Sequence, residues 1–201
     1  VMLQQTQLAV ALPYWRRWMQ VFPSAEALAA ASLDQVRLQW QGLGYYSRAR
    51  RLHEAALMLM GQSWPRTVEG WMALPGIGRT TAGSIVSSAF NAPVAILDGN
   101  VKRVLARLHA HPRPPARDQA LFWVWSEALL DPERPRDVNQ ALMDLGATLC
   151  TPRQPDCSRC PWRTFCAAYA AGDPTCWPVG DTRKPLPFQV IGVGLVLNAA
   201  G

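Results

Sequence analysis

Four cysteines lie within the seventeen residues 150–166, and they constrain the fold of this chain more than any other feature. Cys150, Cys157, Cys160 and Cys166 form the pattern C-x6-C-x2-C-x5-C. Thiolates bind soft metals, so four of them this close together can enclose one metal centre. A structural zinc site more often uses two C-x2-C pairs or a pair of histidines, and this segment has neither. The spacing therefore favours a [4Fe–4S] cluster, which needs a wider cage of thiolates, over zinc.

The composition describes a basic chain with enough apolar residues for a core. Its 201 residues include 20 Lys and Arg against 14 Asp and Glu, a formal net charge of +6, which suits a polyanionic partner. Cys176 lies outside the cysteine pattern, and we assign it no metal role. No apolar run reaches the roughly 18 residues that a membrane span needs, so we predict no membrane partner.

Apolar residues recur at helical spacing over almost the whole chain, so we predict an all-α fold. Ser32 and Gln35 have the spacing of a capping box, and Thr67 is a candidate cap for a short helix. Further helices are expected over 45–60, 79–90, 98–108, 117–130 and 136–149. The β-branched segment at about 189–197 predicts a single strand, and a lone strand indicates the beginning of a further domain.

The segment LPGIGRTTAG, residues 74–83, lies between two predicted helices. Gly76 and Gly78 permit a tight turn and a close approach of the backbone to a ligand. The next helix begins at about Arg79, so its free N–H groups and the positive end of its dipole point out of the turn, as in phosphate-binding sites. The sequence L-P-G-x-G between two helices resembles the helix-hairpin-helix element, which binds a nucleic-acid phosphate through main-chain amides.

Asp98 follows the hairpin and precedes the predicted helix of the segment ILDGNVKRVLARL. As a helix N-cap it needs no further role. A helix-hairpin-helix followed by an aspartate is, however, typical of one glycosylase superfamily, which makes Asp98 a candidate catalytic residue together with Asn100. Lys102, Arg103 and Arg107 continue along the helix and are candidates to contact the DNA backbone.

Taken together, these segments resemble the adenine DNA glycosylases of the MutY family over nearly the whole chain. The resemblance is carried by VMLQQTQ, GLGYYSRARRL, LPGIGRTTAG, ILDGNVKRVLARL, NQALMDLGATLC and the cysteine spacing, which is that of the iron–sulfur loop in endonuclease III and MutY. It implies a bacterial, cytoplasmic, nucleoid-associated monomer that binds double-stranded DNA. The implied reaction is N-glycosidic hydrolysis that removes adenine mispaired with 8-oxoguanine or guanine.

The resemblance also implies roles for individual residues. Asp98 would stabilise the oxocarbenium-like sugar, as a carboxylate does in glycoside hydrolysis. Gln4 and Gln5 would meet the exposed base edges through their amides, and Tyr45 would enter the base stack as a wedge. The remaining predicted DNA contacts are Gly76, Gly78, Arg79, Lys102 and Arg103.

Two positions bear on the chemistry. The family pattern places a glutamate, which protonates the departing adenine, immediately before Val1; we therefore expect this chain to bind DNA but to excise adenine slowly or not at all. Bifunctional relatives of the endonuclease III type carry a lysine where this chain has Thr80, near the active site. A hydroxyl cannot form an imine, so we expect β-lyase activity to be absent or weak.

We expect two helical lobes with Asp98 and the DNA cleft between them. The predicted divisions are a helix-hairpin-helix lobe over 1–93, a cluster lobe over 94–170, a linker over 171–188 and the start of a Nudix-like domain over 189–201. An endonuclease III-like glycosylase for oxidised pyrimidines is an alternative, which Thr80, LQQTQ and the terminal strand disfavour. A non-catalytic iron–sulfur DNA-binding protein stays open, whereas a ferredoxin-like carrier would have no use for a phosphate-binding hairpin.

Overall fold

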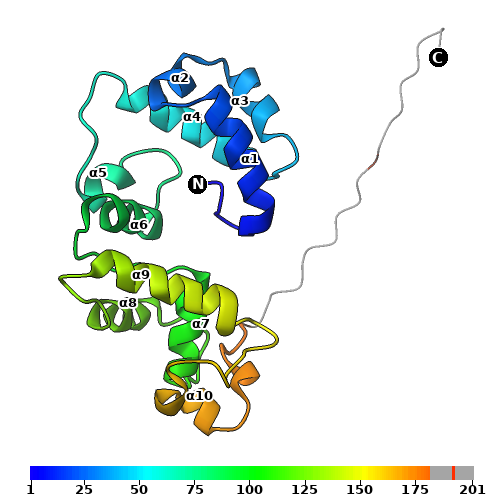
Figure 1. Cartoon of the computed structure of the whole chain (residues 1–201), viewed down its shortest axis with the longest axis vertical. Coiled ribbons are helices and arrows are strands. Elements are labelled where there is room, and N and C mark those ends of the chain that lie inside the picture. Colours follow the sequence, from blue (N-terminus) through cyan, green and yellow to red (C-terminus); the bar gives the residue numbers. More distant parts are fainter. Residues whose placement is uncertain (182–191, 193–201) are drawn as a thin grey trace.

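The computed structural model describes residues 1–181 and residue 192, and within them all regular structure is helical (Figure 1). The all-α prediction is confirmed, while the predicted strand lies outside the described residues. The α-helices are α1 (Leu8–Val21), α2 (Ala25–Ala30), α3 (Leu33–Trp40), α4 (Ser47–Leu59), α5 (Val68–Met72), α6 (Arg79–Phe90), α7 (Gly99–Leu108), α8 (Gln119–Ala128), α9 (Pro135–Asp144) and α10 (Ala167–Ala170). Three short helices complete the list: the π-helix η1 (Leu145–Leu149) and the 3-10 helices η2 (Arg163–Phe165) and η3 (Pro174–Cys176). Over the described stretch, no helix has the length and apolarity to cross a membrane.

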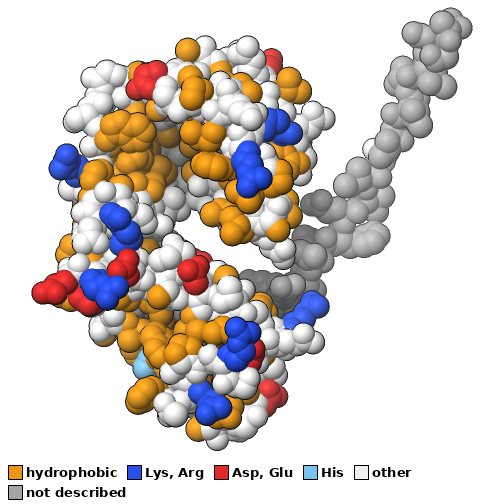
Figure 2. Space-filling model, in the orientation of Figure 1, with side chains coloured by type: hydrophobic (Ala, Val, Ile, Leu, Met, Phe, Trp, Pro, Cys, Tyr) orange, Lys and Arg blue, Asp and Glu red, His pale blue; other side chains and the backbone are white. Residues whose placement is uncertain are grey.

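The helices divide into an upper and a lower group (Figure 1). Helices α2 and α3 pack on α4 in the upper group, and α5 packs on α6. In the lower group, α7 contacts α8, α9, α10 and η1, so it is the central helix there. Helix α6 meets α9 and connects the two groups, and the surface is hollowed beside this connection (Figure 2).

Local sequence signals begin several helices where they were predicted. The hydroxyl of Ser32 accepts the amide of Gln35, whose side chain accepts the amide of Ser32 in return, so the capping box at α3 is confirmed. Thr67 caps α5 by accepting the amide of Gly70. Helix α6 ends at Phe90, and its C-cap Asn91 has the left-handed conformation with φ +52°.

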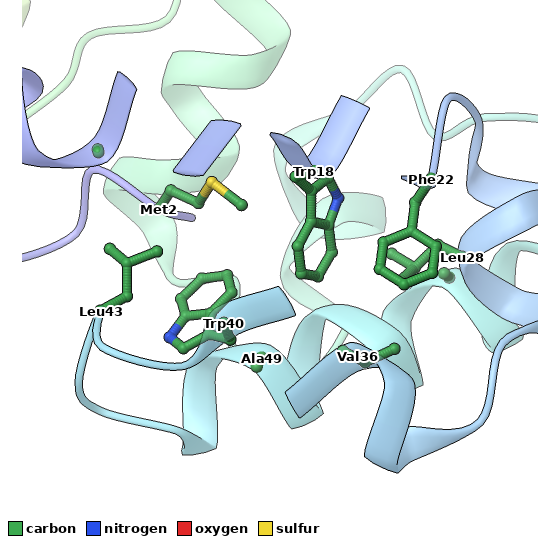
Figure 3. Packing of buried hydrophobic residues seen from close by; sticks show 10 residues of the cluster. Met2, Trp18, Phe22, Leu28, Val36, Trp40, Leu43 and Ala49 are labelled. Carbon is green, nitrogen blue, oxygen red and sulfur yellow. The ribbon is translucent and has the colours of Figure 1, made fainter. Parts of the chain in front are cut away.

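The core of the upper group is built from large aromatic and aliphatic side chains (Figure 3). The rings of Trp18 and Trp40 meet edge to face with centroids 5.7 Å apart, and Phe22 packs edge-on against Trp18. Val36 and Trp40 on α3 are fully buried. Met2 joins this core from outside the helices, so the N-terminal segment is held in place by apolar packing as well as by polar contacts.

Two further apolar clusters lie on either side of residue 95. One contains residues from α4, α5 and α6, ending with Val86. The other begins at Ile96 and is formed by α7, α8 and α9. Asn139 of α9 links the two, because its amide donates to the Ser87 hydroxyl of α6 and to the carbonyl of Val94. The predicted lobe boundary near 93–94 stays a prediction, and this change of cluster is the packing that bears on it.

The helix predicted over 136–149 is divided into two kinds of helix. Regular α-helical bonding ends with α9 at Asp144, and η1 continues as a π-helix in which the Cys150 amide donates to the Leu145 carbonyl over 2.7 Å. Gly146 lies in this π-helix and packs closely on α7, since a Cβ there would lie 2.6 Å from the Cβ of Asn100. The wider turn thus brings the backbone before the cysteines against the beginning of α7.

Candidate DNA-binding and glycosylase site

Asp98 is the N-cap of α7, as predicted, and its carboxylate is held by two donors. One oxygen accepts the Val101 amide at 2.7 Å, and the other accepts the side-chain amide of Asn100 at 3.3 Å. The residue is half-buried, with apolar neighbours Ile96 and Leu97 before it in the interior. The carboxylate is therefore fixed in direction while part of the residue is open to solvent.

The helix after the hairpin is attached next to this aspartate. The Thr80 hydroxyl, on the first turn of α6, donates to the carbonyl of Leu97 at 3.0 Å. Because Leu97 and Asp98 are consecutive, this bond brings the beginning of α6 to the beginning of α7. The two motifs that the sequence singled out separately, the hairpin and the aspartate, form one site.

The two predicted hairpin glycines have different reasons for being glycine. Gly76 has φ +79°, and a Cβ there would lie 3.0 Å from Cβ and Cδ of Arg51. Gly78 caps α6 in an extended conformation, and a Cβ there would meet nothing within 4 Å. Gly76 is needed for the turn itself, whereas Gly78 leaves open space in front of the free amides of α6, where an anion can approach.

Arg79, another predicted DNA contact, is engaged with the lower group of helices. Its guanidinium makes a 2.8 Å ion pair with Glu127, and its Cζ lies 3.9 Å from the ring centre of Trp123. Both side chains of the ion pair remain half exposed. A phosphate at the hairpin would therefore have to compete with Glu127 for this guanidinium.

The N-terminal segment lies against α6. The Gln4 side-chain amide donates to the Thr81 hydroxyl at 3.0 Å. Gln4 therefore contacts the residue that follows Thr80. Gln5 and Tyr45 both have left-handed backbones, with φ +59° and +48°, and Tyr45 is 64% exposed. The structure thus sets both residues in turns, with Tyr45 facing solvent as a wedge into DNA would require.

Two of the three cations expected to contact DNA along α7 point into the protein. Arg107 is 2% exposed, so the expectation that it meets DNA is wrong. The Arg103 guanidinium donates to the carbonyls of Cys150 and Gly146 and to the Asn100 side chain, at 2.7–2.8 Å. Burial lowers the pKa of Arg103, and the nearby Cys150 opposes that shift. These internal bonds do not match the DNA contact predicted for Arg103. For Lys102, the DNA contact stays a prediction.

Arg107 and Arg103 instead hold the cysteine segment on α7. Arg107 donates to the Cys150 sulfur at 3.3 Å and to the carbonyls of Thr151, Pro152 and Trp177 at 2.7–2.9 Å. The Cys166 thiol donates back to the carbonyl of Arg107 at 3.4 Å. The first and last cysteines of the pattern are therefore attached to the same residue.

The four pattern cysteines are half-buried and electrostatically coupled. Burial raises the pKa of the Cys157 thiol, and the other three cysteines raise it further. Within residues 1–181 and 192, however, no three His, Cys, Asp or Glu side chains converge closely enough to hold a single metal ion. Cys176 is exposed and its thiol contacts Asp173, apart from the other four.

Comparison with known families agrees with this geometry. Residues 1–127 match the family described as HhH-GPD superfamily base excision DNA repair protein. The chain belongs to the HhH-GPD superfamily. Residues 150–166, which run from the first to the last pattern cysteine, match the iron–sulfur binding domain of endonuclease III. The predicted [4Fe–4S] cluster is thereby confirmed for this HhH-GPD protein.

Within the HhH-GPD superfamily, the chain is similar to adenine DNA glycosylases. Adenine DNA glycosylase from Mus musculus is 50% identical over 175 residues, which are 84% of this chain and 34% of the relative. The Homo sapiens protein of the same name is 48% identical over 174 residues, again 84% of this chain and 32% of the relative. The predicted resemblance to adenine DNA glycosylases is confirmed, and the chain spans about a third of the length of these relatives.

Solved structures show the same fold. A thermostable thymine-DNA glycosylase superposes with a TM-score of 0.76 at 26% identity, covering 85% of this chain and 81% of that one. A non-covalent endonuclease III–DNA complex gives 0.72 at 23% identity, over 85% of this chain and 80% of the other. The helix-hairpin-helix glycosylase fold predicted from the sequence is therefore confirmed.

Sequence reasoning missed the internal roles of the arginines. Arg48, Arg103 and Arg107 each have several donors directed at carbonyl oxygens of loops. The available signal was position: each lies on the same helix face as buried apolar residues, and an arginine there needs internal acceptors. The sequence analysis instead named Arg103 and Arg107 as candidates to contact DNA.

Proposed function

We propose that this chain is the core of a monofunctional DNA glycosylase that removes adenine from double-stranded DNA in which it is mispaired with 8-oxoguanine or guanine, and that it acts as a monomer. The observation that carries the proposal is the Thr80–Leu97 bond, which sets the free amides of the hairpin helix beside Asp98. One part can hold a backbone phosphate while the other faces the sugar of an extruded nucleotide. The names of the relatives supply adenine as the base.

In this proposal the Asp98 carboxylate lies beside the sugar as positive charge develops there. Electrostatic stabilisation of that kind is aimed at charge that appears in the transition state. Asn100 and the Val101 amide keep the carboxylate in one orientation, so little reorganisation is needed during the reaction. The glutamate that the family pattern places ahead of Val1 would protonate the departing adenine.

Thr80 supports a hydrolytic rather than a lyase reaction. A Schiff base to the sugar requires an amine, and the Thr80 hydroxyl is instead used to hold the Leu97 carbonyl. We therefore propose that the product is an intact abasic site. Trapping of a covalent protein–DNA adduct with borohydride would contradict this part of the proposal and would favour the endonuclease III-like alternative.

Cys150, Cys157, Cys160 and Cys166 are the proposed ligands of the [4Fe–4S] cluster. When bound, the cluster supplies a cross-link that joins the loop 150–166 to α7 through the residues that contact Arg107. Two helical lobes, over 1–93 and 94–170, then face the DNA with Asp98 between them. Gln4, Gln5, Tyr45 and Lys102 complete the proposed DNA contacts.

Single-turnover release of adenine tests the proposal. The substrate is a duplex with one adenine opposite 8-oxoguanine, and a duplex with the same adenine opposite thymine is the control. The chain is assayed as it is and with either glutamate or glutamine added before Val1. We expect fast release only from the mispair, and faster release with glutamate than with glutamine before Val1. Equal release from both duplexes, or none with glutamate present, would contradict the proposal.

Asp98→Asn is the matched variant for the same assay. Asparagine keeps the N-cap bond to Val101, so the stability of α7 should change little. The negative charge is lost, so we expect the rate of adenine release to fall about 10²- to 10³-fold. A rate within twofold of the parent would remove Asp98 from the mechanism.

A further inference from the structure

Arg48, on the first turn of α4, is buried, and no carboxylate of the described residues pairs with it. It is 8% exposed, and among the described residues no ion pair to Asp or Glu involves it. Burial lowers the pKa of Arg48 from its very high ordinary value. A buried cation is costly unless its donors are satisfied, so its partners show why it lies there.

The first set of partners is the N-terminal segment 1–6. One guanidinium nitrogen donates to the carbonyls of Val1 and Met2, at 3.3 and 3.0 Å, and makes a short bond to that of Gln4. The other nitrogen donates to the Thr6 hydroxyl at 3.1 Å. These acceptors surround the left-handed residue Gln5, so the turn is closed around the guanidinium.

The second set is the turn before α4. The same second nitrogen lies 3.4 and 3.5 Å from the carbonyls of Leu43 and Gly44. The guanidinium carbon lies 5.6 Å from the ring centre of Tyr45 and 5.2 Å from that of Trp40. Trp40 also donates its ring N–H to Gly44 at 2.9 Å. The turn that presents the left-handed, exposed Tyr45 is thus attached to the same cation.

We propose that Arg48 is a positioning residue that locks the 1–6 segment and the 43–46 turn into one rigid unit, so that the glutamines and Tyr45 meet a mispair together. This inference rests on the proposed function, which gives Gln4, Gln5 and Tyr45 their DNA contacts. The unit is also joined to the hairpin helix, because Gln4 donates to Thr81. Arg48 therefore acts through these residues and touches no DNA itself.

The planar guanidinium is essential to this role. It presents five donors in a fixed fork, which can reach two segments at once. A lysine keeps the charge but has three donors on a single nitrogen and cannot span both segments. Arg48→Lys thus separates positioning from charge, and Arg48→Met removes both.

The first test compares binding of the chain to three duplexes by fluorescence anisotropy. They contain adenine opposite 8-oxoguanine, guanine or thymine, with 2-aminopurine next to the mispair to report unstacking. Because two or three of these bonds are lost, we expect Arg48→Lys to lower the preference for the 8-oxoguanine duplex about tenfold. Affinity for the thymine duplex should change less than twofold, and the 2-aminopurine signal should fall.

The controls separate positioning from loss of folding. Arg37→Lys changes an exposed arginine whose partner is Asp34, and it should leave all three affinities unchanged. In a Gln4→Ala, Gln5→Ala, Tyr45→Ala background, Arg48→Lys should have no further effect on the preference. An equal loss of affinity for all duplexes would overturn the inference, because it would indicate a merely structural role.

Hydrogen exchange in the free protein tests the inference independently of the proposed function. The amides of Gln4 and Thr6 bond to the carbonyls of Val1 and Leu3, and that of Leu43 bonds to Trp40. We expect Arg48→Lys to increase exchange at all three amides together, and Arg37→Lys to change none. Faster exchange in one segment alone, or in neither, would overturn the inference even if the parent chain binds the mispair selectively. Unselective binding by the parent chain would instead count against the proposed function.

Discussion

The helices of residues 1–90 and the loop 150–181 are held together by different physical means. The first region buries large apolar side chains such as Trp18, Trp40 and Val36. In the second, the longest helix is the four-residue α10, and the main attachments are the polar bonds of Arg103 and Arg107. The first region therefore folds by hydrophobic burial, whereas the second depends on arginines and on its iron–sulfur cluster.

Loss of the cluster should have the largest effect and should be confined to the second region. We expect Cys160→Ser to abolish iron binding and to expose 150–170 to proteolysis, because the remaining bonds cannot replace four metal–sulfur attachments. Cys176→Ser is the control, since that thiol is exposed and apart from the pattern. Iron content and cleavage sites are the measurements. Full iron content in Cys160→Ser would contradict the proposed ligand set.

A cavity in the first region should lower the stability of that region and leave the iron–sulfur loop unaffected. Trp40→Ala removes a fully buried ring that contacts Trp18, and we expect it to lower the free energy of unfolding by about 3–5 kcal/mol. Iron content should not change in the protein that remains folded. Denaturant unfolding followed together with iron absorbance checks both points, and simultaneous loss of iron at low denaturant would show that the regions are not independent.

Arg107→Met should have an intermediate effect in the second region. Three carbonyls and one sulfur lose a donor, and all four of these bonds are partly buried, so we expect a loss of about 2–3 kcal/mol. Arg159→Met is the matched control: its side chain is 76% exposed and its guanidinium lies 3.6 Å from the Asp156 carboxylate, so we expect a loss of about 0–1 kcal/mol. Equal effects of the two substitutions would show that the bonds of Arg107 do not hold the loop.

The smallest expected effect is a pH dependence at the junction of α7 and the loop after it. Burial, followed by the nearby His111, lowers the pKa of His109, whose ring stacks on Trp125 at 4.0 Å. The unfolded chain therefore binds this proton more readily, and stability is lost as the pH falls from 7 through the unfolded pKa of about 6.5. His109→Gln should flatten this slope. NMR titration of the ring would contradict the account if its pKa lies above 6.5.

Much of the fold and the position of the site follow from the sequence, for identifiable reasons. Caps such as Ser32 and Asp98 are local, so spacing alone predicts them. The hairpin and Asp98 could each be found by motif, but their junction depends on the Thr80–Leu97 bond, which has no local signal. The close approach of Gly146 to Asn100 joins positions 46 residues apart, so helical periodicity could not predict it. Nor could the inward direction of Arg103 and Arg107, since charge alone does not reveal the carbonyls that surround them.

The central claim is that Asp98 faces the sugar of an extruded deoxyadenosine while the hairpin amides hold its strand. A crystal structure of the chain bound to a duplex with a non-hydrolysable adenosine analogue opposite 8-oxoguanine tests this most directly. The account predicts a carboxylate oxygen of Asp98 about 3–3.5 Å from the sugar carbon that carries the base. An Asp98 that caps α7 but lies far from any sugar, with the hairpin amides away from phosphate, would contradict it.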